Sequence, residues 1–423
     1  MAIPTLAMIP SGYKAGKLYS VLPSDGTGDF TVARNSVATR VNQSGLIEEV
    51  GVNVPRLDYS AGGCPVLLTE IESQNKITNS EDFTTNWTAT AASVTANQII
   101  SPNGNLTGSL IQSTTANISF IEPINSPLII GNTYTYSVFV KKGNNQWIRL
   151  AHISSGATGC WFDLENGVVG TVNSQSATID EYENDWYRIS NTFIATSVSS
   201  NSVFIGICDD NGSTSAGAIG QNFYVYGAQV EQQPAATSYI KTTGSATTRE
   251  KDLVNGAGSA ATFNSLEHTL FLDLNSVFDG GVISDISIVG SAGTVTDNRI
   301  LIRKQANNTS LDFSIRSGAS NVAGETLVNI DFSIKQKIAI TLKENEIKYY
   351  RNGFLLATDT GTIPLPISLG EITLTSGTTG GKLAASTKDI RYYNEVLTAA
   401  ETLELMSYDS FNEMASALQY TIK

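Results

Sequence analysis

Alternation of apolar and polar positions over short runs is the main pattern of this chain. In Thr133–Val140 (TYTYSVFV), tyrosine and valine side chains share one face while threonine and serine share the other, broken only by Phe139. Because successive side chains of a strand point to opposite faces, this run predicts a half-buried strand. Short strands with no convincing helix between them predict an antiparallel sandwich over residues 76–240. The further strand candidates of this region are Trp186–Phe193, Val203–Ile207 and Phe223–Val230.

A second region, residues 252–397, alternates more regularly. Leucine, isoleucine or phenylalanine occupies every other position in Leu270–Leu274, Leu311–Arg316 and Ile338–Lys343. Asn352-Gly353 lies between two strand-like runs and predicts a tight hairpin, because a type I′ turn needs φ > 0 at both central positions. Asn166-Gly167 gives the same signal in the first region. Residues 252–397 therefore predict a second antiparallel sandwich.

The remaining segments lack this regular pattern. Residues 1–75 are punctuated by Gly and Pro, so we expect an extended N-terminal segment that attaches to a neighbouring subunit or to another protein. The polar, Thr-rich residues 241–251 are expected to link the two sandwiches.

Thr398–Glu401 has the spacing of a capping box and Ser410–Glu413 repeats it, which predicts two short helices within residues 398–423. These helices either cover a sandwich edge or contact a neighbouring subunit. The predicted fold class is mainly β: two antiparallel sandwiches, an extended N-terminal segment and a short C-terminal helical tail.

Composition narrows the range of partners. The 423 residues carry a net charge of -13, and 15% of them are charged. The sequence has no cluster of Lys and Arg residues. Both observations argue against binding to nucleic acid or to anionic membrane surfaces. No apolar run approaches the ~18 residues of a membrane span. The N-terminal stretch MAIPTLAMIPSGYK has two prolines and no basic region, unlike a secretion signal. Cys64, Cys160 and Cys208 are odd in number and far apart, which predicts small buried side chains and folding in a reducing cytoplasm.

Motifs for catalysis are not found. The two histidines, His152 and His268, have no partner at metal-ligand spacing, and no Gly-x-Ser-x-Gly elbow occurs. Residues 252–397 lack a Glu-x-Asp-x-x-Glu pattern, although carboxylates from distant strands can still pair in space. Ser376–Leu383 resembles a phosphate-binding loop but lacks its first glycine and its final Ser/Thr. The sequence thus predicts a protein that is not an enzyme.

One acidic run suits a metal. Glu181, Glu183 and Asp185 alternate ahead of Trp186, so in an extended strand their oxygen atoms would share a face, and hard oxygen ligands are those that Ca²⁺ prefers. The alternative is a solvated acidic turn. No other cofactor is indicated.

Aromatic side chains are the candidates for sugar binding. Rings can stack on the C–H faces of pyranoses, while neighbouring polar groups bind the hydroxyls. Trp147 follows the polar loop Gly143–Gln146, and Trp161 alternates with Asp163 along a predicted strand. Tyr350 and Arg351 lie beside a hairpin turn and are expected to be exposed. The alternative for each tryptophan is a place in the core. The remaining aromatic candidates are Trp87, Trp186 and Tyr187.

Three segments carry a resemblance to tailed-phage fibre and appendage proteins. Gln221–Arg249 (QNFYVYGAQVEQQPAATSYIKTTGSATTR) resembles the closing strand and exit loop of their carbohydrate-binding jelly rolls. Thr39–Tyr59 and Cys64–Glu70 resemble a segment that recurs near their N-termini. Residues 76–240 as a whole resemble such a jelly roll, and residues 252–397 resemble a concanavalin-like or laminin-G-like sandwich.

The resemblance implies a virion protein, a tail or head fibre, made in the cytoplasm of a host bacterium. It further implies a homo-oligomer, as a trimer, joined to other virion proteins by the N-terminal segment. Three functions follow from it. The protein is an adhesin that binds host-surface glycans without cleaving them, a structural fibre or assembly protein whose lectin-like folds bind no sugar, or a polysaccharide depolymerase.

Overall fold

The computed structural model describes residues 2–124, 128–152, 159–196, 203–276, 284–290, 297–307, 309–332, 334–366, 368–374, 383–409 and 411–417. The chain forms two compact units. Unit 1 consists of Met1–Ser36, Gly51–Ile71 and Lys251–Lys423, and unit 2 of Val37–Val50 and Glu72–Glu250. Each unit therefore joins segments that lie far apart in the sequence.

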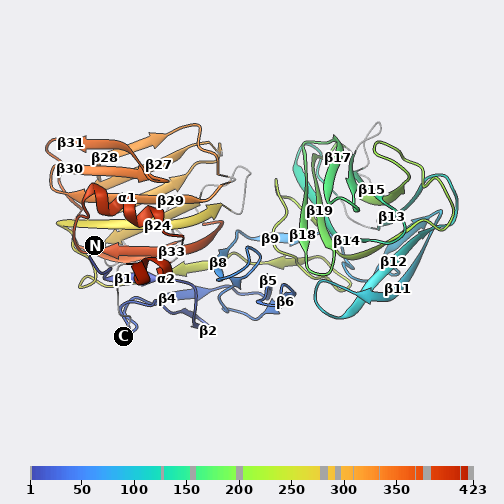
Figure 1. The fold of residues 1–423 in the computed structure, drawn as a ribbon, viewed down its shortest axis with the longest axis horizontal. Helices are drawn as coiled ribbons and strands as arrows, with labels where there is room; N and C mark the ends of the chain where they lie inside the picture. The colour runs from blue at the N-terminus through green and yellow to red at the C-terminus, as the bar shows by residue number, and fades with distance from the viewer. Residues whose placement is uncertain are drawn as a thin grey trace. The chain divides into compact units, whose positions relative to one another are not determined.

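Unit 2 is a sandwich of two six-stranded antiparallel sheets (Figure 1). The first sheet has the order β10 (Trp87–Thr90), β13 (Ser119–Pro123), β20 (Val203–Cys208), β15 (Trp147–His152), β16 (Gly159–Asp163), β17 (Val168–Asn173). The second has the order β11 (Ala92–Ile100), β12 (Leu106–Ser113), β21 (Asn222–Glu231), β14 (Thr133–Lys142), β19 (Trp186–Ile194), β18 (Ser176–Tyr182). Alternate side chains of both sheets meet in one core, in which Tyr134, Tyr136, Val138 and Val140 are completely buried. The predicted face of this strand is thus confirmed.

Phe139, which broke the predicted alternation, belongs to a second cluster on the opposite face of β14. It packs there with Ile47, Trp186, Tyr226 and Tyr239. Its ring meets that of Tyr239 edge-on, with centroids 6.0 Å apart. Ile47 comes from the hairpin β5 (Ala38–Val41) and β6 (Ile47–Val50). The hairpin and the segment around Tyr239 cover this face, so that both faces of the strand are buried.

Unit 1 is also a sandwich of two antiparallel sheets. The larger has the order β31 (Phe354–Thr360), β30 (Glu346–Arg351), β29 (Gln336–Lys343), β24 (Glu267–Ser276), β33 (Ala385–Tyr393), β8 (Val66–Thr69), β7 (Leu57–Asp58), and β1 (Leu6–Met8) also pairs with β33. The smaller has the order β28 (Ser320–Leu327), β27 (Leu311–Ser317), β26 (Arg299–Lys304), β25 (Ser284–Gly290), β32 (Leu369–Thr373). The predicted inward faces of β24, β27 and β29 all lie in the core between the sheets. Asn352 and Gly353 both have positive φ, as the type I′ hairpin requires.

The smaller pairings of the two units involve short strands. In unit 1, β2 (Tyr13–Lys14), β3 (Lys17–Leu18), β4 (Phe30–Ala33) and β23 (Leu253–Asn255) form a four-stranded sheet. In unit 2, β9 (Ser73–Asn75) pairs with β22 (Thr247–Arg249).

The two C-terminal helices, α1 (Ala399–Ser407) and α2 (Phe411–Ala417), lie against the outer face of the larger sheet (Figure 1). Leu405, Met406 and Met414 pack there on Phe271 and Tyr350. The predicted capping box is present, with the Thr398 hydroxyl accepting from the Glu401 amide and the Glu401 carboxylate accepting in return. Ser410 lies outside the described residues, so its capping role is not described. The helices therefore cover a sheet face of their own unit. None of the described helices is long and apolar enough to cross a membrane.

The N-terminal residues differ from their prediction. Instead of one extended segment, residues 1–75 are divided between the two units, where they contribute strands to several sheets. Residues 241–251 are not a free linker either, because Thr247–Arg249 pairs with Ser73–Asn75. Sequence periodicity missed this arrangement because strands of two to four residues are too short to show alternation.

A buried ion cluster of Arg34, Arg56, Glu70 and Asp252 holds the N-terminal residues within unit 1. Asp252 accepts from Arg34 Nη1 at 2.9 Å and from Arg56 Nη2, while Arg56 Nη1 donates to Glu70 at 2.6 Å. All four side chains are at most 3% exposed. Two positive and two negative charges are thus balanced in the interior, and Arg56, whose pKa is raised by the two carboxylates in spite of its burial, stays charged.

Two local predictions need correction. Cys64 is exposed, whereas Cys160 and Cys208 are buried as expected. The hairpin at Asn166-Gly167 is confirmed, but its loop spans 164–167 and only Gly167 has positive φ. The reason is Asp163, whose carboxylate accepts from the amides of Glu165 and Asn166 and stabilises a wider turn.

Candidate functional site: an aromatic sheet face in unit 2

All four tryptophans lie in unit 2, and they differ in exposure. Trp87, Trp161 and Trp186 are buried, at 8%, 1% and 1% exposed, whereas Trp147 is half-buried. Trp147 is therefore the tryptophan that a ligand in solution can reach.

Trp147 lies on the outer face of the sheet that contains β15. Its neighbours Ile148 and Leu150 point into the core, so that Trp147 and Arg149 point away from it. In register, Arg149 lies opposite Trp161 of β16 on one side and Gly206 of β20 on the other. We call the side chains that line this surface the aromatic face: Phe120, Trp147, Arg149, Trp161 and Phe204.

Arg149 is held between two rings of the aromatic face. Its guanidinium carbon lies 5.0 Å from the ring centroid of Trp161 and 5.1 Å from that of Phe204. Phe204 in turn contacts Phe120, with centroids 5.0 Å apart. Burial lowers the pKa of Arg149 from its usual value and raises that of nearby Cys208 to about 12. The stack is a preorganised cation–π arrangement.

The indole of Trp147 rests on a glycine. A Cβ on Gly170 of β17 would lie 2.7 Å from Cζ3 of Trp147 and 2.5 Å from Oδ1 of Asn211. That Asn211 oxygen accepts from the amide of Thr171 at 2.8 Å, which fixes the amide side chain beside the ring. The absence of a side chain at residue 170 therefore lets the ring lie across the sheet, next to an exposed amide.

The aspartate nearest to Trp147 in the sheet is not free to react or to bind a ligand. Asp163, directly opposite in register, is 4% exposed. Its carboxylate accepts from the Gln146 side chain at 2.9 Å and from both the amide and the side chain of Asn166. Asp163 thus serves the turn. The groups available for contact are the half-buried rings of Phe120, Trp147 and Phe204 and the exposed amide of Asn211, whereas Arg149 is 6% exposed.

The other predicted sugar contacts are either buried or part of unit 1. Trp161 is on the aromatic face, but its indole N–H donates to the Ser213 carbonyl at 2.5 Å and it is 1% exposed, so it cannot serve as a stacking platform. Tyr350, expected to be exposed beside its turn, is 1% exposed because the C-terminal helices cover it. Arg351 is half-buried and its Nε donates to Gln336 Oε1 at 2.6 Å. Tyr350 and Arg351 belong to unit 1 and are not part of the aromatic face.

The predicted calcium ligands do not come together. Glu181 lies on β18, which ends at Tyr182, and Asn184 and Asp185 both have positive φ in the turn that follows. The turn ends the alternation that would have put the three carboxylates on one face. Within the described ranges no group of three or more His, Cys, Asp or Glu residues could hold a metal ion. Glu181, Glu183 and Asp185 are instead exposed, and Asp185 pairs with Lys141 at 3.3 Å.

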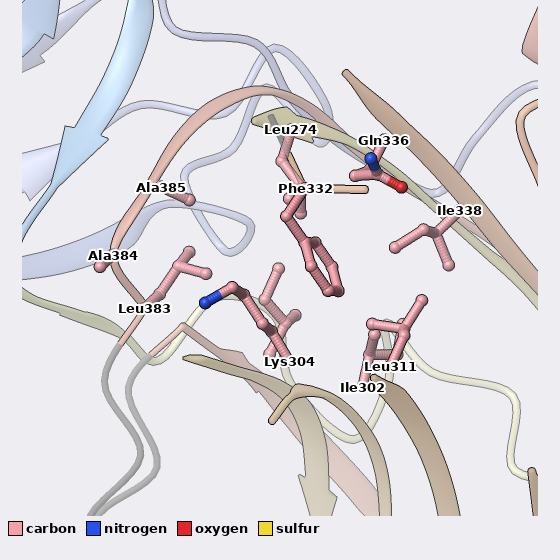
Figure 2. A pocket seen from close by; sticks show the side chains of 11 residues that line it. Leu274, Ile302, Lys304, Leu311, Phe332, Gln336, Ile338, Leu383, Ala384 and Ala385 are labelled. Carbon is pink, nitrogen blue, oxygen red and sulfur yellow. The ribbon is translucent and has the colours of Figure 1, made fainter. Parts of the chain in front are cut away.

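A cavity between the sheets of unit 1 is too small for a sugar. Figure 2 shows that Phe332 and Lys304 project into it among aliphatic side chains. The Lys304 ammonium lies 5.5 Å from the ring centroid of Phe332. The free space of about 30 Å³ is enough for about two water molecules. The phosphate-loop-like segment cannot be compared, because residues 376–382 lie outside the described residues.

Comparison with known proteins identifies no family. No family model matches the chain, and no curated protein shows significant similarity. Among solved structures, the chain is similar to a sialidase carbohydrate-binding module from Ruminococcus gnavus bound to α2,3-sialyllactose, at 16% identity and a TM-score of 0.30, over 36% of this chain and 92% of that chain. It is also similar to a galectin from Caenorhabditis elegans, at 11% identity and a TM-score of 0.24, over 30% of this chain and 84% of that chain.

A pentraxin from Limulus polyphemus matches at 13% identity and a TM-score of 0.25, over 34% of this chain and 71% of that chain. These proteins include carbohydrate-binding modules and lectins. The scores are too low to transfer a ligand or a site, so the aromatic face has to be judged on its own geometry.

Sequence reasoning found Trp147 but missed its neighbours. Phe204 lies between Val203 and Ile205, both buried, so that alternation along this strand could have placed it on the opposite face with Arg149. Gly170 and Asn211 gave no signal, because their contact depends on how β17 and the loop after β20 meet in space.

Proposed function

We propose that the protein is a non-catalytic glycan-binding protein and that the aromatic face of unit 2 binds the sugar. The observation that carries the proposal is the half-buried indole of Trp147, which lies against Gly170 beside the exposed Asn211. A pyranose would stack its C–H face on this ring, while the amide and neighbouring backbone groups would bind its hydroxyls. A single shallow contact of this kind gives weak affinity, which several copies in one particle would raise.

We further propose that the setting is a phage virion, in which the protein serves as a trimeric tail or head fibre that attaches to a host glycan. The support for this setting is the resemblance of Gln221–Arg249 and of the N-terminal segments to fibre proteins. It is tested separately, by mass spectrometry of purified particles and by the mass of the purified protein in solution. Absence from particles would remove the virion setting and leave the sugar-binding proposal untouched.

The binding test uses the full chain on an array of bacterial surface polysaccharides. Hits are then measured by calorimetry, because its signal does not depend on the Trp147 indole that one of the variants removes. Trp147→Ala should weaken binding at least tenfold. Gly170→Ala should do the same without removing the ring, because its Cβ displaces the indole.

The matched control is Phe354→Ala, which removes a ring that is 69% exposed in unit 1. It should leave binding unchanged. Equal binding by the wild type and by both unit 2 variants would refute the aromatic face as the site. Release of new reducing ends from a bound polysaccharide would refute the non-catalytic assignment and favour a depolymerase. A folded protein that binds no glycan on the array would favour a structural role.

A further inference from the structure

A second polar surface lies on unit 1, on the outer face of the five-stranded sheet. The inward side chains of β26 and β27 fill the core, so that Arg299, Leu301 and Arg303 point outward from β26. On β27 the outward residues are Asp312, Ser314 and Arg316. In register, Arg299 lies directly opposite Arg316 and Arg303 opposite Asp312.

The three arginines of this surface are not equivalent. Arg303 is neutralised by Asp285, to which Nε and Nη2 donate at 2.7 and 2.8 Å. Arg316 donates from Nη2 only to the Ala319 carbonyl. Within the described part of the chain, neither Arg299 nor Arg316 forms an ion pair, and both Nε atoms are buried without a hydrogen-bond partner.

This arrangement is unfavourable unless something else is bound. Like charges directly opposite each other on neighbouring strands destabilise a sheet, and a buried donor without an acceptor has lost its water. Burial and the positive charge of Arg316 lower the pKa of Arg299. The carboxylate of Asp285 opposes this lowering of the Arg299 pKa, but both of its oxygens already accept from Arg303. We call Arg299 and Arg316 the arginine pair.

A shallow hollow adjoins the arginine pair over β27 and β28. It has a volume of about 370 Å³ and is lined by Phe313, Ser314 and residues 321–326, among which Glu325 carries the one charged side chain. Gly324 is opposite Ser314 in register, and a Cβ at this position would lie 2.4 Å from the Phe313 carbonyl oxygen, so the two strands approach too closely there for a side chain. The volume falls in the range of ligand sites, about 300–1,000 Å³. Hydroxyl and amide groups of this kind suit the hydroxyls of a sugar.

We propose that the outer face of this sheet is a second binding site, which takes an acidic sugar whose carboxylate is bound by the arginine pair. Guanidinium groups are suited to carboxylates because their parallel N–H donors match the two oxygens. The sugar ring then lies in the hollow beside Ser314 and Asn321. The site belongs to unit 1 and is independent of the aromatic face.

The test compares two oligosaccharides that differ only in charge. Galacturonate hexamer carries free carboxylates, whereas its methyl ester has the same backbone without them, and sodium sulfate tests for attraction of any anion. Binding to the full chain is measured by calorimetry. The hexamer should bind and should weaken with added salt, the ester should bind at least tenfold more weakly, and sulfate should not compete at equal charge concentration.

Variants locate the site. Arg299→Gln and Arg316→Gln should each weaken hexamer binding at least tenfold. Lys14→Gln, which removes one exposed charge from elsewhere on unit 1, is the matched control and should have no effect. Trp147→Ala should also leave hexamer binding intact, which separates this site from the aromatic face.

Thermal unfolding shows whether a variant that binds poorly has lost the binding site or has lost its fold. Because each substitution relieves repulsion, the melting temperature should stay the same or rise, and a fall would mean that the arginines are structural. Absence of hexamer binding to the wild type, equal binding of the ester, or unchanged binding by both Arg299→Gln and Arg316→Gln would each overturn the proposal.

Discussion

The buried ion cluster of unit 1 makes the most definite prediction about stability. Asp252 accepts from Arg34, from Arg56 and from the Glu70 amide at 2.9 Å. In Asp252→Asn the shape of the side chain is kept, but one acceptor oxygen becomes an N–H₂ group that faces a guanidinium. The cluster changes from neutral to a net charge of +1, with both arginine side chains 0% exposed.

The expected cost follows from removing one partner of a buried pair, which typically destabilises by about 3–5 kcal/mol. For a unit of this size, each kcal/mol corresponds to about 2–4 °C, so the melting transition of unit 1 should fall by about 10 °C. A second variant, Glu346→Gln, is the control. Glu346 pairs with Lys343 and Lys348 at 3.1 and 3.0 Å on a partly exposed hairpin, where such pairs contribute about 0–1 kcal/mol.

The assays are thermal and urea unfolding followed by far-ultraviolet circular dichroism, with tryptophan emission recorded in parallel. All four tryptophans belong to unit 2, so the emission reports that unit. Asp252→Asn should shift the dichroism transition. A loss below about 1 kcal/mol, or a loss seen in the tryptophan signal alone, would refute the claim that the cluster holds unit 1 together.

Three further predictions concern single side chains. Burial lowers the pKa of His268 to about 4, below its unfolded value of about 6.5, so the unfolded chain binds the extra proton between these values. Stability should fall by about 3 kcal/mol as the pH drops from 6.5 to 4, and His268→Gln should flatten this slope in pH-dependent unfolding. Lys337 donates to the carbonyls of Met406 and Tyr408 at 2.8 Å each, and Lys337→Met should speed hydrogen exchange in α1 while leaving the core strands protected. Of the three thiols only that of Cys64 is exposed, so a thiol reagent should label one site per native chain and three after denaturation.

Sequence periodicity predicted the inward faces of the strands but not what covers their outer faces. The core face of Thr133–Val140 was predicted correctly. Successive side chains of a strand alternate between its two faces, so the apolar positions identify the face that packs in the core. Phe139 did not fit this alternation, because it is an apolar residue on the polar face. In the structure, Ile47 and Tyr239 cover it on that face. Tyr350 was expected to be exposed for the same reason, since its cover comes from helices more than fifty residues later.

The candidate site shows the same limit at the level of side chains. Trp147 and Trp161 were both candidates from sequence, and Trp147 was favoured because it follows the polar loop Gly143–Gln146. Their difference in exposure arises from the loop that brings the Ser213 carbonyl to the indole of Trp161, and loop paths of this kind leave no periodic trace. The predicted calcium site failed because two consecutive residues with positive φ ended a strand that the acidic pattern had extended.

In each sandwich the two outer faces differ from each other, and this contrast is the best guide to function. One outer face in each unit is covered by apolar packing: the face around Phe139 by the β5–β6 hairpin, and the face around Tyr350 by α1 and α2. The opposite sheet in each unit carries cations on its outer face, Arg149 between rings in unit 2 and the arginine pair in unit 1. Stability alone would favour apolar or neutral residues at these positions, because a desolvated or facing cation is costly. If the reasoning is right, replacing the arginine pair by glutamine should retain or raise stability and abolish acidic-sugar binding together, a combination that a purely structural role cannot produce.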